Sequence, residues 1–254
     1  MIRLIVCFLL LSFQIFAQQS SDSTSIDTAA IEKKIDFKYQ QLIIPAVFIG
    51  YGIIGLESGQ IKGFNAGIRD EVVEDIDEKT SIDDFSQYAP AASLYILPAL
   101  GVKSKNNLKD RTIILATSYL LMGLTVNAFK KTASVERPDK SSLNSFPSGH
   151  TATSFMGAEL MMQEFKAESV WYGISGYVVA AGTGAFRMYN NKHWLSDVVA
   201  GAGIGILSAK AGYWLYPYTS RLFTKKNSKT TNTKTAMIPF YDGKTAGFGF
   251  VKTF

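Results

Sequence analysis

The sequence predicts an all-α fold, an antiparallel bundle of six helices, followed by a short β-hairpin-like tail. Two observations carry this prediction. At 254 residues, 47% of them hydrophobic, the chain is long enough for one main domain with a sizeable core. Apolar segments rich in glycine, alanine and serine recur along it, as expected of helices that pack with their backbones close together. These segments span residues 42–56, 88–102, 112–129, 150–162, 170–186 and 197–216.

The first residues are typical of an export signal. Arg3 supplies a basic start, residues 4–16 form an apolar run, and Ala17 precedes a polar stretch, so cleavage is expected near Ala17. The single cysteine, Cys7, lies within this signal. The mature chain is therefore expected to lack both disulfides and thiol chemistry.

The net charge of +5 is concentrated toward the C-terminus, where basic residues crowd into a Ser/Thr/Asn-rich stretch. This stretch is interpreted as a solvated linker, and no nucleic-acid-binding motif accompanies it. After it, "MIPFYDGKTAGFGFVKTF" predicts a hairpin turned at Asp242-Gly243. The acidic stretch 70–84 is interpreted as an amphipathic surface insertion rather than a site. The predicted organisation is a signal (1–17), a lead-in (18–41), the helical domain (42–217) and a linker with tail (218–254).

Each apolar segment falls near or below the roughly 20 residues that span a bilayer, so both membrane helices and buried helices fit. In an antiparallel bundle, the basic connection 103–111 and the basic linker lie at the end opposite the motifs described below. The positive-inside rule places that end in the cytoplasm and the motifs on the periplasmic side. A cleaved signal leaves the new N-terminus outside, and six crossings from there would turn the motifs toward the cytoplasm. The two expectations agree only if the first segment, interrupted by Pro45, lies against the bundle without crossing the membrane.

If successive helices run antiparallel, the loops that follow the third and the fifth helix emerge at one end of the bundle. The fourth and the sixth helix begin at that same end. The first loop carries Lys130 and Arg137, which on their own are more often interfacial anchors than functional residues. The fourth helix opens with Ser148, Gly149 and His150. Free backbone N–H groups, a hydroxyl and a glycine that allows close approach make an anion cradle there, although Ser148 also fits an ordinary N-cap.

The third motif supplies Arg187, His193 and Asp197. A histidine and an aspartate four residues apart on a helix lie on one face, where the carboxylate can hold one imidazole nitrogen and leave the other nucleophilic, whereas a solvated surface pair is the alternative. The chain has only two histidines, and both fall in these three loops together with three cations. This coincidence favours a common site for anions.

Taken together, Lys130-x6-Arg137-Pro138, Pro147-Ser148-Gly149-His150 and Arg187-x5-His193-x3-Asp197 resemble the three-part signature of the type 2 phosphatidic acid phosphatase (PAP2) superfamily. The resemblance spans residues 42–216. One departure is visible, because Phe186 stands where the family usually has serine.

The resemblance implies a bundle of the PAP2 and haloperoxidase type, in which His193 attacks phosphorus to give a phosphohistidine. Asp197 would orient His193, and His150 would protonate the leaving oxygen. The expected phosphate ligands are Lys130, Arg137, Ser148, Gly149 and Arg187. No metal or other cofactor is expected, since the sequence shows no carboxylate cluster or His/Cys ligand set.

These expectations describe a phosphatase that hydrolyses a phosphomonoester or pyrophosphate, most readily of a lipid phosphate presented by the membrane. Neither nucleic acid nor a particular oligomeric state is implied. The mean hydropathy of +0.09 favours a second possibility, a soluble periplasmic non-specific acid phosphatase. A vanadium-dependent haloperoxidase and a non-catalytic membrane or assembly protein with the same fold are further possibilities.

Overall fold

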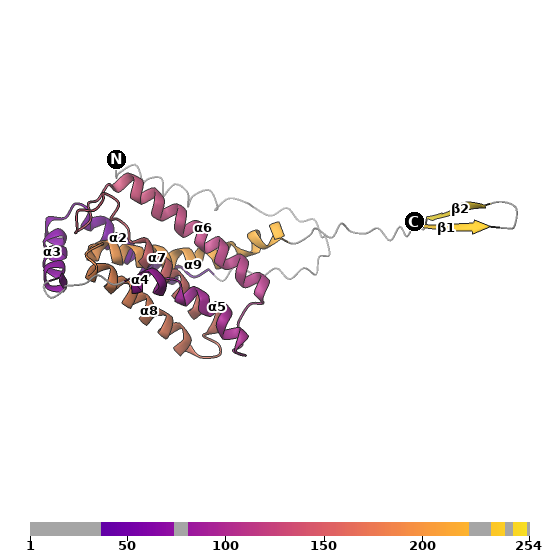
Figure 1. Cartoon of the computed structure of the whole chain (residues 1–254), viewed down its shortest axis with the longest axis horizontal. Coiled ribbons are helices and arrows are strands. Elements are labelled where there is room, and N and C mark those ends of the chain that lie inside the picture. Colours follow the sequence, from indigo (N-terminus) through magenta and orange to yellow (C-terminus); the bar gives the residue numbers. More distant parts are fainter. Residues whose placement is uncertain (1–36, 74–80, 224–234, 242–245, 253–254) are drawn as a thin grey trace. The chain divides into compact units, whose positions relative to one another are not determined.

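The computed structural model describes residues 37–73, 81–223, 235–241 and 246–252 (Figure 1). The signal, most of the lead-in, the linker 224–234 and the turn at Asp242-Gly243 lie outside these residues.

The described part of the main domain is helical, as predicted. Its elements are a 3-10 turn η2 (Tyr39–Leu42) and the helices α2 (Ile43–Gly55), α3 (Gly59–Val73), α4 (Ile82–Ser86), α5 (Ala89–Ala99), α6 (Leu108–Ala133), α7 (Gly149–Phe165), α8 (Val170–Tyr189) and α9 (Leu195–Phe223). In the tail, β1 (Thr235–Tyr241) and β2 (Ala246–Lys252) pair antiparallel.

The six predicted helices correspond to α2 and α5 to α9, but the prediction of six was too low because it missed α3 and α4. Helix α3 has three glycines in fifteen residues, which lowers helix propensity, and little apolar periodicity. Helix α4 has five residues, too few for a periodic pattern. Tertiary contacts, described below, hold both in place.

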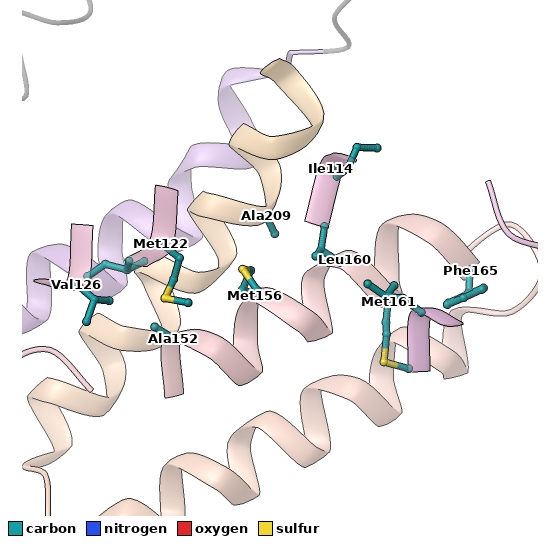
Figure 2. Packing of buried hydrophobic residues seen from close by; sticks show 11 residues of the cluster. Ile114, Met122, Val126, Ala152, Met156, Leu160, Met161, Phe165 and Ala209 are labelled. Atoms are coloured by element: carbon teal, nitrogen blue, oxygen red, sulfur yellow. The ribbon is translucent and has the colours of Figure 1, made fainter. Parts of the chain in front are cut away.

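Helix α7 runs through the middle of the bundle, with α8 and α9 as its main neighbours and α5 and α6 also against it (Figure 1). Its apolar side chains meet those of α6 and α9 in one buried cluster (Figure 2). The labelled members are Ile114, Met122, Val126, Ala152, Met156, Leu160, Met161, Phe165 and Ala209. Burial of this cluster fixes α7, and with it the start of α7 that carries the second motif.

Small residues let α7 and α9 touch backbone to backbone. A Cβ at Gly205 would stand 2.3 Å from the carbonyl oxygen of Ala152, and one at Gly201 would stand 2.5 Å from that of Ser148. Any side chain at either position would push the helices apart. The predicted close packing is thus confirmed, and it sets Ser148 directly against α9.

Within the described part of the chain, two helices, α6 and α9, are long and apolar enough to cross a membrane. A third span arises if η2 with α2 and then α3, which bend by 96° between them, count as one broken crossing. Large apolar side chains on the outer faces, such as Leu120, Leu124 and Val178, are exposed in the described part of the chain. These faces suit lipid contact.

Candidate active site

The loop after α6 and the loop after α8 are fastened to each other. The backbone N–H of Asp139 donates to the carbonyl of Asn191 at 3.1 Å, and the Lys192 ammonium pairs with the Asp139 carboxylate at 2.5 Å. The indole N–H of Trp194 donates to the carbonyl of Glu136 at 2.9 Å. The first and third motifs therefore meet at one end of the bundle, as the antiparallel order predicts.

The second motif is tied to the third through Asp197. Its backbone carbonyl accepts from the N–H of Ser148 at 3.0 Å. Its carboxylate Oδ2 accepts from the hydroxyl of Ser145 at 2.5 Å and from the backbone N–H of Trp194 at 3.0 Å. Asp197 is therefore held rigidly, with one carboxylate oxygen directed by two donors.

His193 and Asp197 form a buried pair. Nδ1 of His193 lies 3.6 Å from Oδ2 of Asp197, an ion-pair contact longer than a hydrogen bond, and both side chains are almost fully buried. Helix α9 begins at Leu195, so His193 lies in the preceding loop and not on the helix with Asp197. Burial lowers the pKa of His193 to about 4, although Asp197 opposes this shift. The imidazole is therefore neutral at pH 7.

Three cations surround this pair. Lys130 Nζ donates to the carbonyl of Asn144 at 2.7 Å, and Arg137 Nε donates to the Asn144 side-chain oxygen at 3.1 Å, so both sit against the loop that leads into α7. The charges of Lys130 and Arg187 both act on His193. The charges of Arg137 and Arg187 also act on Lys130. Like charges gathered in this way leave a region suited to a multiply charged anion.

Ser148 lies at the start of α7 and is the N-cap of that helix. Its buried hydroxyl accepts from the N–H of Thr151 at 3.4 Å and lies 2.9 Å from the Thr151 hydroxyl. The capping role of Ser148 is thus observed, while phosphate binding by its hydroxyl stays a prediction. A Cβ at Gly149 would meet only Val126, at 3.8 Å, so packing alone does not require glycine at this position.

Asp83 and Asp84, at the end of the acidic stretch 70–84, lie at this site, so the interpretation as a surface insertion was wrong for these two residues; residues 74–80 lie outside the described part of the chain. Asp83 of α4 is buried and pairs with the Arg187 guanidinium, and its other oxygen accepts from the amide of Asn190 at 2.9 Å. Asp84 lies 2.9 Å from Nε2 of His150. The charge run suggested a solvated face, but Asp83 and Arg187 are 104 positions apart, and only the fold brings them together.

The expectation that no carboxylate cluster exists was also wrong. One ligand atom each from Asp83, Asp84 and His150 lies within 4.8 Å of the others, close enough to hold a metal ion. The sequence reasoning missed this group because α4 was not predicted. The Asp83 carboxylate is already paired with the Arg187 guanidinium and accepts a hydrogen bond from Asn190, so its charge is balanced without a metal ion.

Helix α3 braces the loop that carries His193. The side-chain amide of Asn65 donates to the hydroxyl of Ser196 at 2.8 Å, and Arg69 Nε donates to the side-chain oxygen of Asn191 at 3.1 Å. A cavity of about 410 Å³ lies between α3 and the start of α9, with Asn65 and Asp197 among its lining residues.

Phe186, where the family usually has serine, is half-buried and packs edge-on against Tyr189, with ring centroids 6.1 Å apart. It therefore has a packing role. Sequence reasoning missed Ser145, Asp83, Asp84, Asn65 and Arg69. Only Ser145 had a local signal, since it lies two residues before Pro147 in the second motif.

Comparison with known proteins shows what the part of the chain that carries these residues is similar to. The model of the PAP2 superfamily matches residues 111–221, which include all three motifs. A lipid A 1-phosphatase of Porphyromonas gingivalis is 40% identical over 153 residues, 60% of this chain and 34% of that protein. The bacitracin transport permease protein BcrC of Bacillus licheniformis is 35% identical over 77 residues, 30% of this chain and 36% of that protein. The chain thus spans about a third of the length of these two relatives.

Among solved structures, the crystal structure of LpxE from Aquifex aeolicus superposes with a TM-score of 0.45 and 22% identity, covering 59% of this chain and 94% of that one. The motifs, their assembly at one end of the helical bundle and the match of the family model agree with one another. The region of this chain that carries the three motifs, residues 111–221, matches the model of the PAP2 superfamily.

Proposed function

We propose that this protein is a phosphatase that hydrolyses a lipid phosphate through a phosphohistidine on His193. The observation that carries the proposal is the buried His193, with Nδ1 3.6 Å from Oδ2 of Asp197, acted on by the charges of Lys130 and Arg187, in a setting where burial lowers its pKa and favours the neutral ring. A neutral imidazole is nucleophilic, and fixed cations stabilise the charge of a transferring phosphoryl group.

In the first step, Nε2 of His193 attacks phosphorus while the bond from phosphorus to the leaving oxygen breaks. His150 donates its proton to that oxygen. Asp197 interacts with Nδ1, which orients the ring and stabilises the positive charge that develops on it. Lys130, Arg137 and Arg187 contact the equatorial phosphoryl oxygens.

In the second step, water attacks the phosphorus of phosphohistidine. His150, now neutral, accepts a proton from this water as the phosphorus–nitrogen bond breaks. Phosphate leaves, and both histidines return to their starting states. The protein supplies every group in this sequence, so no metal or other cofactor takes part.

The start of α7 completes the proposed phosphate cradle. The N-terminal N–H groups of a helix favour an anion, and the lack of a side chain at Gly149 lets an oxygen approach the backbone. Ser148, which caps the helix, would act mainly by ordering this turn.

The proposed substrate is a lipid phosphate that arrives from the membrane. Helices α6 and α9 have the length and composition of spans, and exposed apolar side chains cover the outer faces of the bundle. The name of the Porphyromonas gingivalis relative, a lipid A 1-phosphatase, agrees with a phosphate carried by a lipid.

The proposed location is the bacterial inner membrane with the site facing the periplasm. Basic residues gather at the far end of the bundle, where Lys109 Nζ donates to the carbonyl of Phe223 at 3.1 Å. The positive-inside rule favours the cytoplasm for that end.

Phosphate release by the purified full-length protein tests the proposed activity. The panel contains a short-chain phosphatidic acid, a phosphatidylglycerol phosphate, a polyprenyl pyrophosphate, a lipid A phosphate and a soluble phosphomonoester. Turnover of a lipid substrate by membrane-bound protein is expected. Preference for the soluble ester by protein recovered in the soluble fraction would instead favour the periplasmic acid phosphatase, and no phosphate release at all would favour a non-catalytic role. Halide oxidation only in the presence of vanadate would indicate a haloperoxidase.

A further inference from the structure

Helix α4 places two adjacent carboxylates against two different groups of the proposed site. Asp83 is buried and engaged by Arg187 and Asn190. Asp84 is 57% exposed, and one of its oxygens lies 2.9 Å from Nε2 of His150 and 4.0 Å from Arg187. Asp83 therefore contacts the site as a buried carboxylate, whereas Asp84 contacts it as a carboxylate that is open to solvent.

The position of α4 is fixed independently of these charges. The hydroxyl of Ser86 lies 2.8 Å from that of Thr183 in α8, an uncharged contact that holds α4 against α8. The contact between Asp84 and His150 thus joins two elements that are already held in place.

We infer that Asp84 is a positioning residue for His150, one that holds Nε2 and favours the protonated form of the ring between turnovers. The inference rests on the proposed function, in which His150 is the proton donor. With Nε2–H bound to Asp84, Nδ1–H is the donor left for the leaving oxygen. After that proton has moved, the neutral ring stays bound to Asp84 through Nε2, and Nδ1 is free to accept a proton from the attacking water.

The charges around His150 show how the contact with Asp84 affects the pKa of the ring. Burial and the positive charge of Arg187 on α8 both lower the pKa of His150, whereas Asp83 and Asp84 on α4 raise it. Asp84 is the carboxylate of α4 that also contacts the His150 ring directly, at 2.9 Å, whereas Asp83 acts on it through its charge alone. Removal of the Asp84 charge should lower the pKa of His150 further and deplete the acid.

The two histidines of the chain make this directly measurable. Full-length protein labelled with ¹⁵N-histidine and purified without a histidine tag is titrated by NMR, and His193→Ala identifies the His150 signal. In Asp84→Asn, the pKa of His150 is expected to fall by on the order of one pH unit. The basic limb of the kcat/KM profile should move to lower pH by the same amount. At any pH above that limb, kcat/KM should therefore fall about tenfold.

Two variants serve as controls. Asp84→Glu keeps the charge and should restore most of the titration and the pH profile. Glu57→Gln removes an exposed carboxylate from the turn between α2 and α3, at the same end of the bundle, and should behave as wild type. Retained thermal unfolding midpoints would show that a changed profile does not come from misfolding.

Wild-type protein that hydrolyses its substrate, together with unchanged titration and pH profile in Asp84→Asn, would overturn this inference and leave the proposed function standing. A lower KM with an unmoved basic limb would overturn it too, since Asp84 would then only repel the anionic substrate. Broadening of the His150 signal by Mn²⁺ that requires Asp84, with activity lost in EDTA, would instead make this cluster a cation site. If the wild type releases no phosphate, the proposed function fails, and the titration alone decides whether Asp84 supports His150.

Discussion

The hydroxyl of Ser145 donates a 2.5 Å hydrogen bond to Oδ2 of Asp197, the same oxygen that lies 3.6 Å from Nδ1 of His193. Ser145 comes from the loop before α7 and Asp197 from the first turn of α9. This hydrogen bond thus joins the loop before the second motif to the third motif. It also directs the Asp197 carboxylate, which in turn orients the proposed nucleophile, His193.

Ser145→Ala is expected to lower kcat while leaving KM nearly unchanged. A hydrogen bond to a charged group is worth about 1.5–3 kcal/mol, so loss of the orientation it provides should cost on the order of tenfold or more in kcat. Steady-state kinetics on a lipid phosphate measure this. Ser142→Ala, in the same loop but bonded to Asn144 instead, is the matched comparison. Equal kinetics for wild type and Ser145→Ala would show that Asp197 needs no such support.

The pH profile follows from the two histidines. The nucleophile His193 must be neutral, and because burial lowers its pKa to about 4, activity is lost as the pH falls through about 4. The acid His150 must be protonated, and because its pKa is lowered, activity is lost as the pH rises through a value below the ordinary imidazole pKa of about 6.5. A bell-shaped dependence of kcat/KM with an acidic optimum is expected. An optimum above pH 8 would contradict the assignment of His150 as the acid.

Vanadate and chelators test the absence of a metal from the mechanism. Vanadate mimics the five-coordinate phosphorus and should compete with the substrate at Lys130, Arg137 and Arg187. EDTA should leave turnover unchanged. Inhibition assays with each compound measure both effects, and activity lost in EDTA and restored by magnesium would require a metal in the reaction.

A buried ion pair away from the site offers a stability prediction. Lys210 of α9 pairs with Glu159 of α7 at 2.6 Å, and Glu159 also accepts from the Tyr177 hydroxyl. Lys210→Met would leave a buried carboxylate without its cation and should cost about 3–5 kcal/mol. The double variant Glu159→Gln/Lys210→Met should recover most of that loss. Thermal unfolding midpoints in detergent measure both, and additive losses in the double variant would show that the pair is not coupled.

The sequence predicted the parts of the site that local pattern encodes. The three motifs lie in loops whose meeting follows from the antiparallel order of apolar helices, and His193 and Asp197 are only four residues apart. The contact between Asp83 and Arg187 had no such signal, because it depends on where the short α4 docks on α8. Nor did the brace from Asn65 to Ser196, because the glycine-rich α3 lacks a clear helical pattern.

The most direct test of the central claim is to trap the phosphoenzyme. Protein mixed with a ³²P-labelled lipid phosphate and quenched at short times should carry label that is stable in alkali and released in acid. Asp197→Asn should form it on the order of 10³- to 10⁴-fold more slowly, because His193 loses the carboxylate that fixes its tautomer. Folded His193→Ala protein should carry no label and show no turnover. Labelled His193→Ala protein, or near-normal phosphate release by it, would contradict the assignment of His193 as the nucleophile.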